Sequence, residues 1–152
     1  MKTTHSLLLS CFALLVATSS ACAQTVAAPA LLDPSSATEQ QLAALPGLDA
    51  AKAKAVVAGR PYATPTAFDA VLAAQGLTVE QRTAVYGKSF VRIHLNTATD
   101  ADMLLIPGLG NKMLREFKEY RPYKAIAQFR REIGKYVDEK EVARLESYVR
   151  VE

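Results

Sequence analysis

The sequence predicts an all-α fold made of two tandem units, each with about four short helices. Three observations support this prediction. Half of the 152 residues are apolar, which is enough for a packed core. Apolar residues recur at helical spacing between the prolines and glycines that end helices. The chain beyond residue 31 also repeats itself, block by block, at a constant offset.

The repeat consists of three short blocks and one phenylalanine, and the separation along the chain is the same in every pair. The matching pairs are Ser36-Ala37-Thr38-Glu39 with Thr97-Ala98-Thr99-Asp100, Leu45-Pro46-Gly47-Leu48 with Ile106-Pro107-Gly108-Leu109, Arg60-Pro61-Tyr62 with Arg121-Pro122-Tyr123, and Phe68 with Phe129. Agreement of separate blocks without a gap indicates a duplicated unit. The boundaries that follow are 32–91 for the first unit and 92–152 for the second.

Residues 1–23 have the pattern of a signal peptide. Lys2 supplies the positive start, Leu7 to Ala17 is apolar, and Ala21-Cys22-Ala23 has the small-x-small form of a cleavage site. The apolar run is too short for a permanent membrane anchor. A lipoprotein signal with Cys22 lipidated is the alternative. Either pattern predicts an exported protein, periplasmic or secreted, with no stable membrane span.

A linker at 24–31 precedes the first unit. Helices are expected over 38–45, 49–59 and 67–75 in that unit, with a last helix opened by Thr78. The second unit is expected to follow the same plan, with a short helix capped by Thr97 or Thr99 that carries Met103, Leu104 and Ile106, and further helices over 111–120, 125–133 and 138–148. Residues 89–95 join the units and are expected to be extended; other strand content should be negligible.

The turn from Ile106 to Lys112 is the strongest candidate for a binding site. Pro107 and the two glycines end one helix, and helix-forming residues follow at once. The first N–H groups of the new helix, its dipole and Lys112 together suit a phosphate. The alternative is that this turn only connects two helices.

The sequence that follows this turn carries an excess of positive charge. From Lys112 to Lys135 there are eight basic and three acidic residues, an excess of five positive charges, whereas Leu31 to Val91 is balanced. A charged run is usually a solvated helix face, so the excess favours an anionic partner without establishing one.

The second unit resembles the helix-hairpin-helix domain of ComEA-like DNA-uptake proteins. The resemblance rests on Leu95-Asn96-Thr97-Ala98, on Ile106-Pro107-Gly108-Leu109-Gly110 and on Tyr120-Arg121-Pro122-Tyr123. It covers nearly all of 93–148 and, more loosely, 32–87. It implies an exported protein that binds double-stranded DNA through the phosphate backbone, without sequence specificity.

Carried over to this chain, the resemblance implies phosphate contacts from the backbone amides of Gly108, Leu109 and Gly110, supported by Lys112. Arg115 lies on the same polar helix face as Lys112 and is added to this site. Glycine permits a positive φ and a close approach of phosphate. A degenerate later turn, Gly134-Lys135, is a candidate for a secondary DNA contact, because it keeps one glycine and one base.

Two departures from the family pattern bear on function. Leu114 stands where the family usually has alanine, which predicts looser packing between helices. The first unit has Asp49 where the second has Gly110, and Ala51 where the second has Lys112. A carboxylate at a helix start is a good cap, but it repels phosphate and occupies the donors. The first hairpin is therefore expected to be structural.

Enzymatic chemistry has no support in the sequence. Once the signal is removed, His94 is the only histidine and no cysteine remains unless Cys22 is kept. We expect no catalytic residues, no metal site and no cofactor. The rival function is a periplasmic interaction or scaffolding module with an envelope protein partner, which keeps the fold without binding DNA. A membrane-surface role for the basic stretch is a third, weaker alternative.

Overall fold

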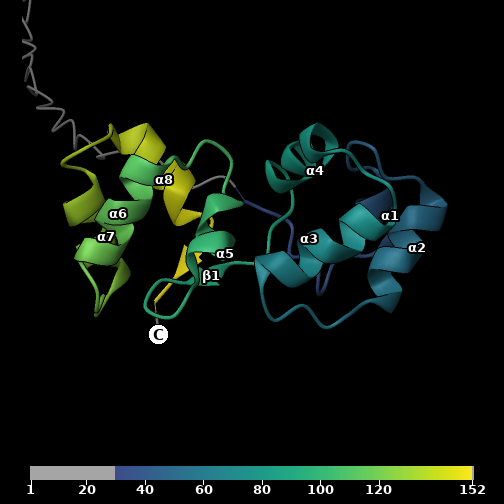
Figure 1. Ribbon diagram of the computed structural model, residues 1–152, viewed down its shortest axis with the longest axis horizontal. Helices are drawn as coiled ribbons and strands as arrows, with labels where there is room; N and C mark the ends of the chain where they lie inside the picture. Colours follow the sequence, from purple (N-terminus) through teal and green to yellow (C-terminus); the bar gives the residue numbers. More distant parts are fainter. Residues whose placement is uncertain (1–29, 152) are drawn as a thin grey trace, which may run out of the picture.

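The computed structural model describes residues 30–151, which are mostly helical. The signal peptide expected at 1–23, with Cys22, and most of the linker expected at 24–31 lie outside the described residues. Within the described part there are eight short helices and one pair of two-residue strands (Figure 1). The elements are α1 (Glu39–Ala43), α2 (Ala50–Ala58), α3 (Pro65–Ala74), α4 (Val79–Tyr86), β1 (Ile93–His94), α5 (Asp100–Leu104), α6 (Asn111–Glu119), α7 (Ile126–Ile133), α8 (Glu139–Glu146) and β2 (Val149–Arg150).

Most helices begin at a side chain that accepts a hydrogen bond from the first turn. Thr38, Thr78 and Thr99 form capping boxes at α1, α4 and α5. Asp49 and Asp138 cap α2 and α8. These caps satisfy N–H groups that a helix start leaves open, which is why such short helices begin where the sequence predicts.

The constant offset of the sequence repeat recurs in the positions of the helices. The starts of α1, α2 and α3 are related to those of α5, α6 and α7 by this same offset, and the start of α4 is related to that of α8 by an offset shorter by a single position. Equivalent arginines also make the same contact, because Arg60 donates to the carbonyl of Ala37 and Arg121 donates to that of Ala98. We refer below to residues 32–91 and 92–151 as the first and second half.

Within the segment expected to be extended at 89–95, Ile93 and His94 form β1, Ser89 forms a bridge and Leu95 lies in a turn. The C-terminal end differs from the prediction. The last helix ends at Glu146 instead of 148, and β2 follows it. β2 pairs in parallel with β1, with Ile93 opposite Val149. Val149 is buried, so pairing with β1 and burial of this side chain outweigh continuation of the helix. In the first half, Leu32 and Ser89 form an isolated parallel bridge.

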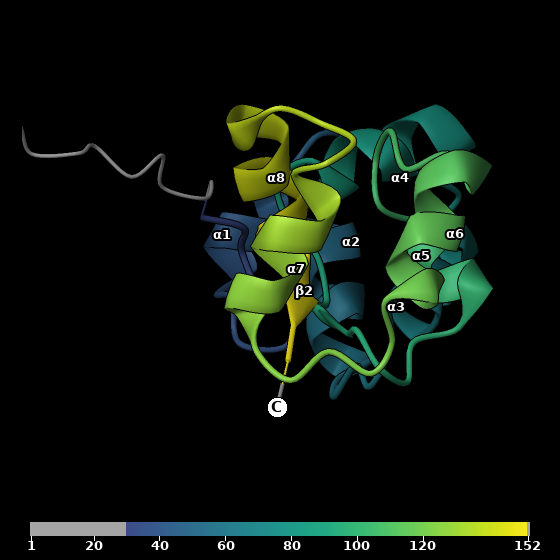
Figure 2. The ribbon, with the colours of Figure 1, turned by 90° about the vertical axis from the view of Figure 1, so that its left-hand side faces the viewer.

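One hydrophobic core runs through both halves. Figure 1 shows α1 to α4 on one side and α5 to α8 on the other, and Figure 2 shows α6, α7 and α8 in front when the second half faces the viewer. The rings of Phe90 and Tyr148, 5.0 Å apart, join the halves. The Tyr148 hydroxyl also donates to the carbonyl of Tyr86 at 3.2 Å. Leu114 is buried in this core.

The helices at residues 30–151 are all too short or too polar to cross a membrane.

Candidate nucleic-acid interface

The hairpin between α5 and α6 is anchored by one buried side chain and one positive backbone angle. Leu109 is buried, and its N–H donates to the carbonyl of Ile106 at 3.0 Å. Gly108 has φ of 78°, a conformation that glycine adopts without a steric penalty. The Leu109 amide, expected to bind phosphate, is therefore already used by the turn. Within the described part of the chain no hydrogen bond engages the N–H groups of Gly108 and Gly110.

The backbone at Gly110 does not require glycine. It is the residue before α6, with extended φ and ψ of −85° and 171°, which any residue adopts. A Cβ atom there would meet nothing within 4 Å. The positive-φ argument thus holds for Gly108 and is wrong for Gly110. Because Gly110 gives α6 no side-chain cap, the N–H groups of the first turn stay open at an exposed surface.

The first hairpin has the same backbone and different chemistry. Gly47 has φ of 75°, and the Leu48 N–H donates to Leu45 at 3.1 Å. Asp49 is extended like Gly110, but its carboxylate accepts from the Lys52 N–H at 2.9 Å. That backbone hydrogen bond from Lys52 holds the pKa of Asp49 below its usual value. A charged carboxylate therefore fills the helix start that Gly110 leaves open.

Lys112 and Arg115 lie on the exposed face of α6, and within residues 30–151 neither makes an ion pair or a side-chain hydrogen bond. Other cations of the basic stretch are engaged. The Lys118 ammonium lies 2.8 Å from Asp100, and the half-buried Arg121 guanidinium donates to Ala98 at 2.9 Å. The free charge near the hairpin is thus smaller than the excess counted along the sequence, and it lies on α6.

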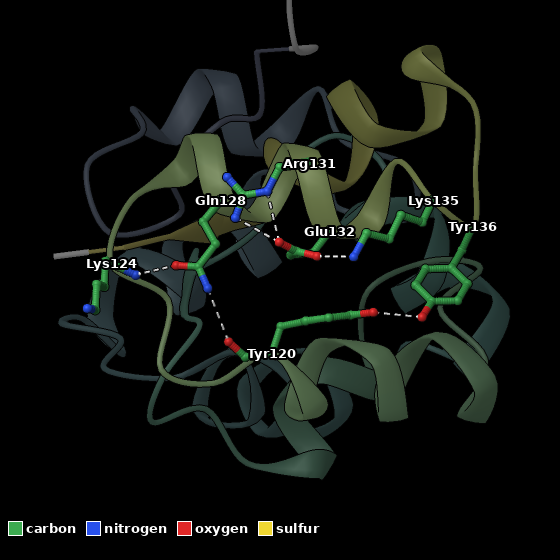
Figure 3. Close-up of polar contacts among 7 residues, drawn as sticks. All are labelled: Tyr120, Lys124, Gln128, Arg131, Glu132, Lys135 and Tyr136. Carbon is green, nitrogen blue, oxygen red and sulfur yellow. Dashed lines mark hydrogen bonds and ion pairs between the residues drawn. The ribbon is translucent and has the colours of Figure 1, made fainter.

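The surface around Gly134 and Lys135 is occupied by its own contacts (Figure 3). The Gly134 N–H donates to Arg130 at 3.0 Å, and a Cβ atom at Gly134 would lie 2.8 Å from that same carbonyl. Close packing therefore explains this glycine, and its amide is not open to phosphate. Lys135 forms an ion pair with Glu132, and a terminal nitrogen of Arg131 lies 2.7 Å from the same carboxylate.

The same surface carries two linked tyrosines (Figure 3). The hydroxyls of Tyr120 and Tyr136 are 2.8 Å apart, and the Lys135 ammonium lies 5.0 Å from the centre of the Tyr120 ring. Gln128 accepts from the Lys124 N–H and donates to the Tyr120 carbonyl. The Lys135 side chain is exposed, and its ammonium is held by Glu132 and lies against the Tyr120 ring.

Sequence reasoning missed Arg144, which lies on α8. One of its terminal nitrogens is 3.6 Å from where a Cβ atom of Gly108 would stand. Glu141 accepts two hydrogen bonds from this guanidinium, each 2.7 Å long, and the group lies 5.7 Å from the centre of the Tyr148 ring. No linear spacing connects Arg144 to the hairpin, so only the fold reveals the contact.

A hollow of ≈ 430 Å³ lies between the hairpin and α4. Its walls include Gly108 and Gly110, together with the exposed side chains of Val79 and Leu104. Leu104 lies on the predicted short helix and is 45% exposed at this hollow.

Metal-ligating side chains do not cluster at residues 30–151. No group of three or more His, Cys, Asp or Glu side chains there could hold a metal ion. The His94 Nδ1 atom accepts from the Asn96 N–H at 3.3 Å, so this imidazole has a local structural contact. The arrangement of groups at the hairpin suits binding of an anion.

No family model, curated protein or solved structure matches this chain.

Proposed function

We propose that the two halves are tandem helix-hairpin-helix units, 32–91 and 92–152, and that the second hairpin binds the backbone of duplex DNA without sequence specificity. The protein would act as an exported, non-enzymatic DNA-binding module. Support for the two units comes from the recurring helix starts, the paired glycines with positive φ and the equivalent arginine contacts.

One observation carries the proposal, and it is the contrast between Gly110 and Asp49. Both residues precede a helix in an extended conformation, so the backbone does not distinguish them. Asp49 closes its helix start with a negative charge, whereas Gly110 leaves N–H donors open beside Lys112. An open helix start with a nearby cation favours phosphate, and a capped one disfavours it.

The expected mode of binding is weak and electrostatic. The amides of Gly108 and Gly110 and the first turn of α6 would donate to one phosphate, with Lys112 and Arg115 adding charge. Contacts to phosphate fix position but do not distinguish bases. A small module of this kind should bind unrelated duplexes with Kd on the order of 10⁻⁴–10⁻⁶ M at physiological salt.

The test is a fluorescence titration of the purified protein against short labelled duplexes of unrelated sequence, between about 50 and about 200 mM salt. We expect similar affinities for all duplexes and a steep loss with salt. Gly110→Asp, which copies the first hairpin, should abolish binding and leave the unfolding temperature unchanged or higher, because it adds a cap. Asp49→Gly is the matched control and should not weaken binding.

Two outcomes would overturn this proposal. If no binding is detected at low salt, duplex DNA is not the ligand. If the affinity does not change with salt, binding does not depend on contacts to phosphate. The rival function, a periplasmic scaffolding module, would be favoured if capture from the cell envelope returned a stoichiometric protein partner and no nuclease-sensitive material. The self-capped hairpin at Asp49 is the feature of the first half that fits this rival.

A further inference from the structure

We infer that Arg144 is a second arm of the phosphate site and contacts the phosphate that the Gly108 amide binds. This inference rests on the proposed function, because it names a further residue of the same site. Arg144 lies on α8, which is distant from the hairpin in sequence, and the fold places its guanidinium next to Gly108.

The position of the guanidinium supports the contact. A terminal nitrogen of Arg144 lies 3.6 Å from the Cβ position of Gly108, and Gly108 is itself exposed. A phosphate that reaches the Gly108 amide therefore comes within reach of this guanidinium. The Arg144 side chain is 29% exposed, so it is accessible to a ligand.

The guanidinium is also held in place before any ligand arrives. Its Nε and Nη2 atoms donate to the two carboxylate oxygens of Glu141, and the Tyr148 ring supports the group. The hydrogen bond to Glu141 raises the pKa of Arg144, so the charge is kept. Guanidinium has five N–H donors, and two of them donate to Glu141. Not all of its donors are used within the protein, and a fixed orientation reduces the entropy lost on binding.

The first half lacks this arrangement. Gly47 faces the side chain of Gln81 at 3.5 Å, a neutral group. Counted from the starts of α4 and α8, the residue that corresponds to Arg144 is Ala84. By the same count, Glu141 corresponds to Gln81. The second hairpin therefore has no carboxylate cap, and beside its turn the Arg144–Glu141 pair replaces a neutral glutamine.

Arg144→Gln tests the inference, because it removes the charge yet keeps an alkyl stem against Tyr148 and an amide that can reach Glu141. We expect about tenfold weaker binding to duplex DNA at low salt, because one hydrogen bond from a charged group is lost. The plot of log affinity against log salt should become shallower by about 0.9, the value for one phosphate contact. Arg144→Lys, which restores the charge, should restore that slope.

Lys124→Ala is the matched control. It also removes one exposed positive charge, but it lies beyond the C-terminal end of α6, away from the hairpin. Its salt slope should equal that of the unchanged protein. The inference is overturned if Arg144→Gln keeps the original slope, or if Lys124→Ala loses as much as Arg144→Gln. Failure of the unchanged protein to bind any duplex is a separate result, which overturns the proposed function itself.

Discussion

Replacing Asp102 by asparagine tests what holds the second hairpin in position against the first half. Asp102 lies in α5, the helix that leads into the hairpin, and it is only 3% exposed. One carboxylate oxygen accepts from the Thr66 N–H and hydroxyl at 3.2 and 2.9 Å, across the two halves. The other accepts from the Thr99 hydroxyl at 2.7 Å.

The size of the effect follows from these contacts. Asparagine has one acceptor oxygen, so it can accept from either Thr66 or Thr99 but not from both in the way the two carboxylate oxygens do. A hydrogen bond to a charged group contributes about 1.5–3 kcal/mol, which gives an expected loss of about 2 kcal/mol. For a folded part of this size, that loss lowers the unfolding temperature on the order of 5–10 °C. The assay is thermal unfolding followed by circular dichroism.

Asp100→Asn is the matched control on the same helix. Asp100 is 54% exposed and pairs with Lys118 at 2.8 Å. Exposed ion pairs contribute about 0–1 kcal/mol, so this substitution should change the unfolding temperature little. Equal losses from the two substitutions would refute the reasoning, because burial and the contacts across the halves would then contribute nothing.

The dependence on pH gives a second check. Burial raises the pKa of Asp102, but the hydrogen bonds from Thr99 and Thr66 outweigh this and leave the pKa below its usual 3.8. A carboxyl group with a lowered pKa in the folded state stabilises the protein above its unfolded pKa, and that contribution is lost as the pH falls through the folded pKa. The difference between the protein and Asp102→Asn should therefore narrow from about pH 6 to about pH 2. A difference that does not change with pH would contradict the assignment.

Three further predictions concern stability and are measured by denaturant unfolding. Gly108→Ala should cost about 1–2 kcal/mol because φ is 78°, whereas Gly110→Ala should cost less than about 0.5 kcal/mol because its backbone is ordinary and its surroundings open; equal costs would contradict the different roles of these glycines. Phe117→Ala should cost about 3–5 kcal/mol, since its ring is fully buried and lies 5.1 Å from that of Phe129. Leu104→Ala, on the exposed side of α5, should cost less than about 1 kcal/mol.

The helices were predictable because their signals are local. Thr38, Thr78 and Asp138 each accept from an N–H three residues ahead, so the residue type and the spacing suffice to place a helix start. Tertiary contacts decide the places where prediction failed. The last helix ends early because Val149 is buried and pairs with β1, a partner far away in sequence.

Within the candidate site, the linear pattern located the turn but not its surroundings. It identified Gly108, Gly110 and Lys112, since prolines, glycines and charges are visible in order. It did not reveal that the Leu109 amide is used by the turn, nor that Lys135 forms an ion pair with Glu132. It also missed Arg144, because α8 meets the hairpin only after the chain has folded.

The two hairpins together separate what the fold requires from what a ligand requires. Gly47 and Gly108 share a positive φ, so the turn itself requires glycine at that position. Asp49 and Gly110 share an extended backbone, and glycine before a helix is only a few tenths of a kcal/mol, roughly, less favourable than a good cap. Exchanging aspartate and glycine before the helix therefore changes the stability of the fold little. It changes phosphate binding much more, because a carboxylate repels a phosphate and accepts from the N–H groups that would bind it. The difference at this one position thus bears on binding far more than on stability, which is why the Gly110→Asp and Asp49→Gly pair separates the DNA-binding proposal from a purely structural role.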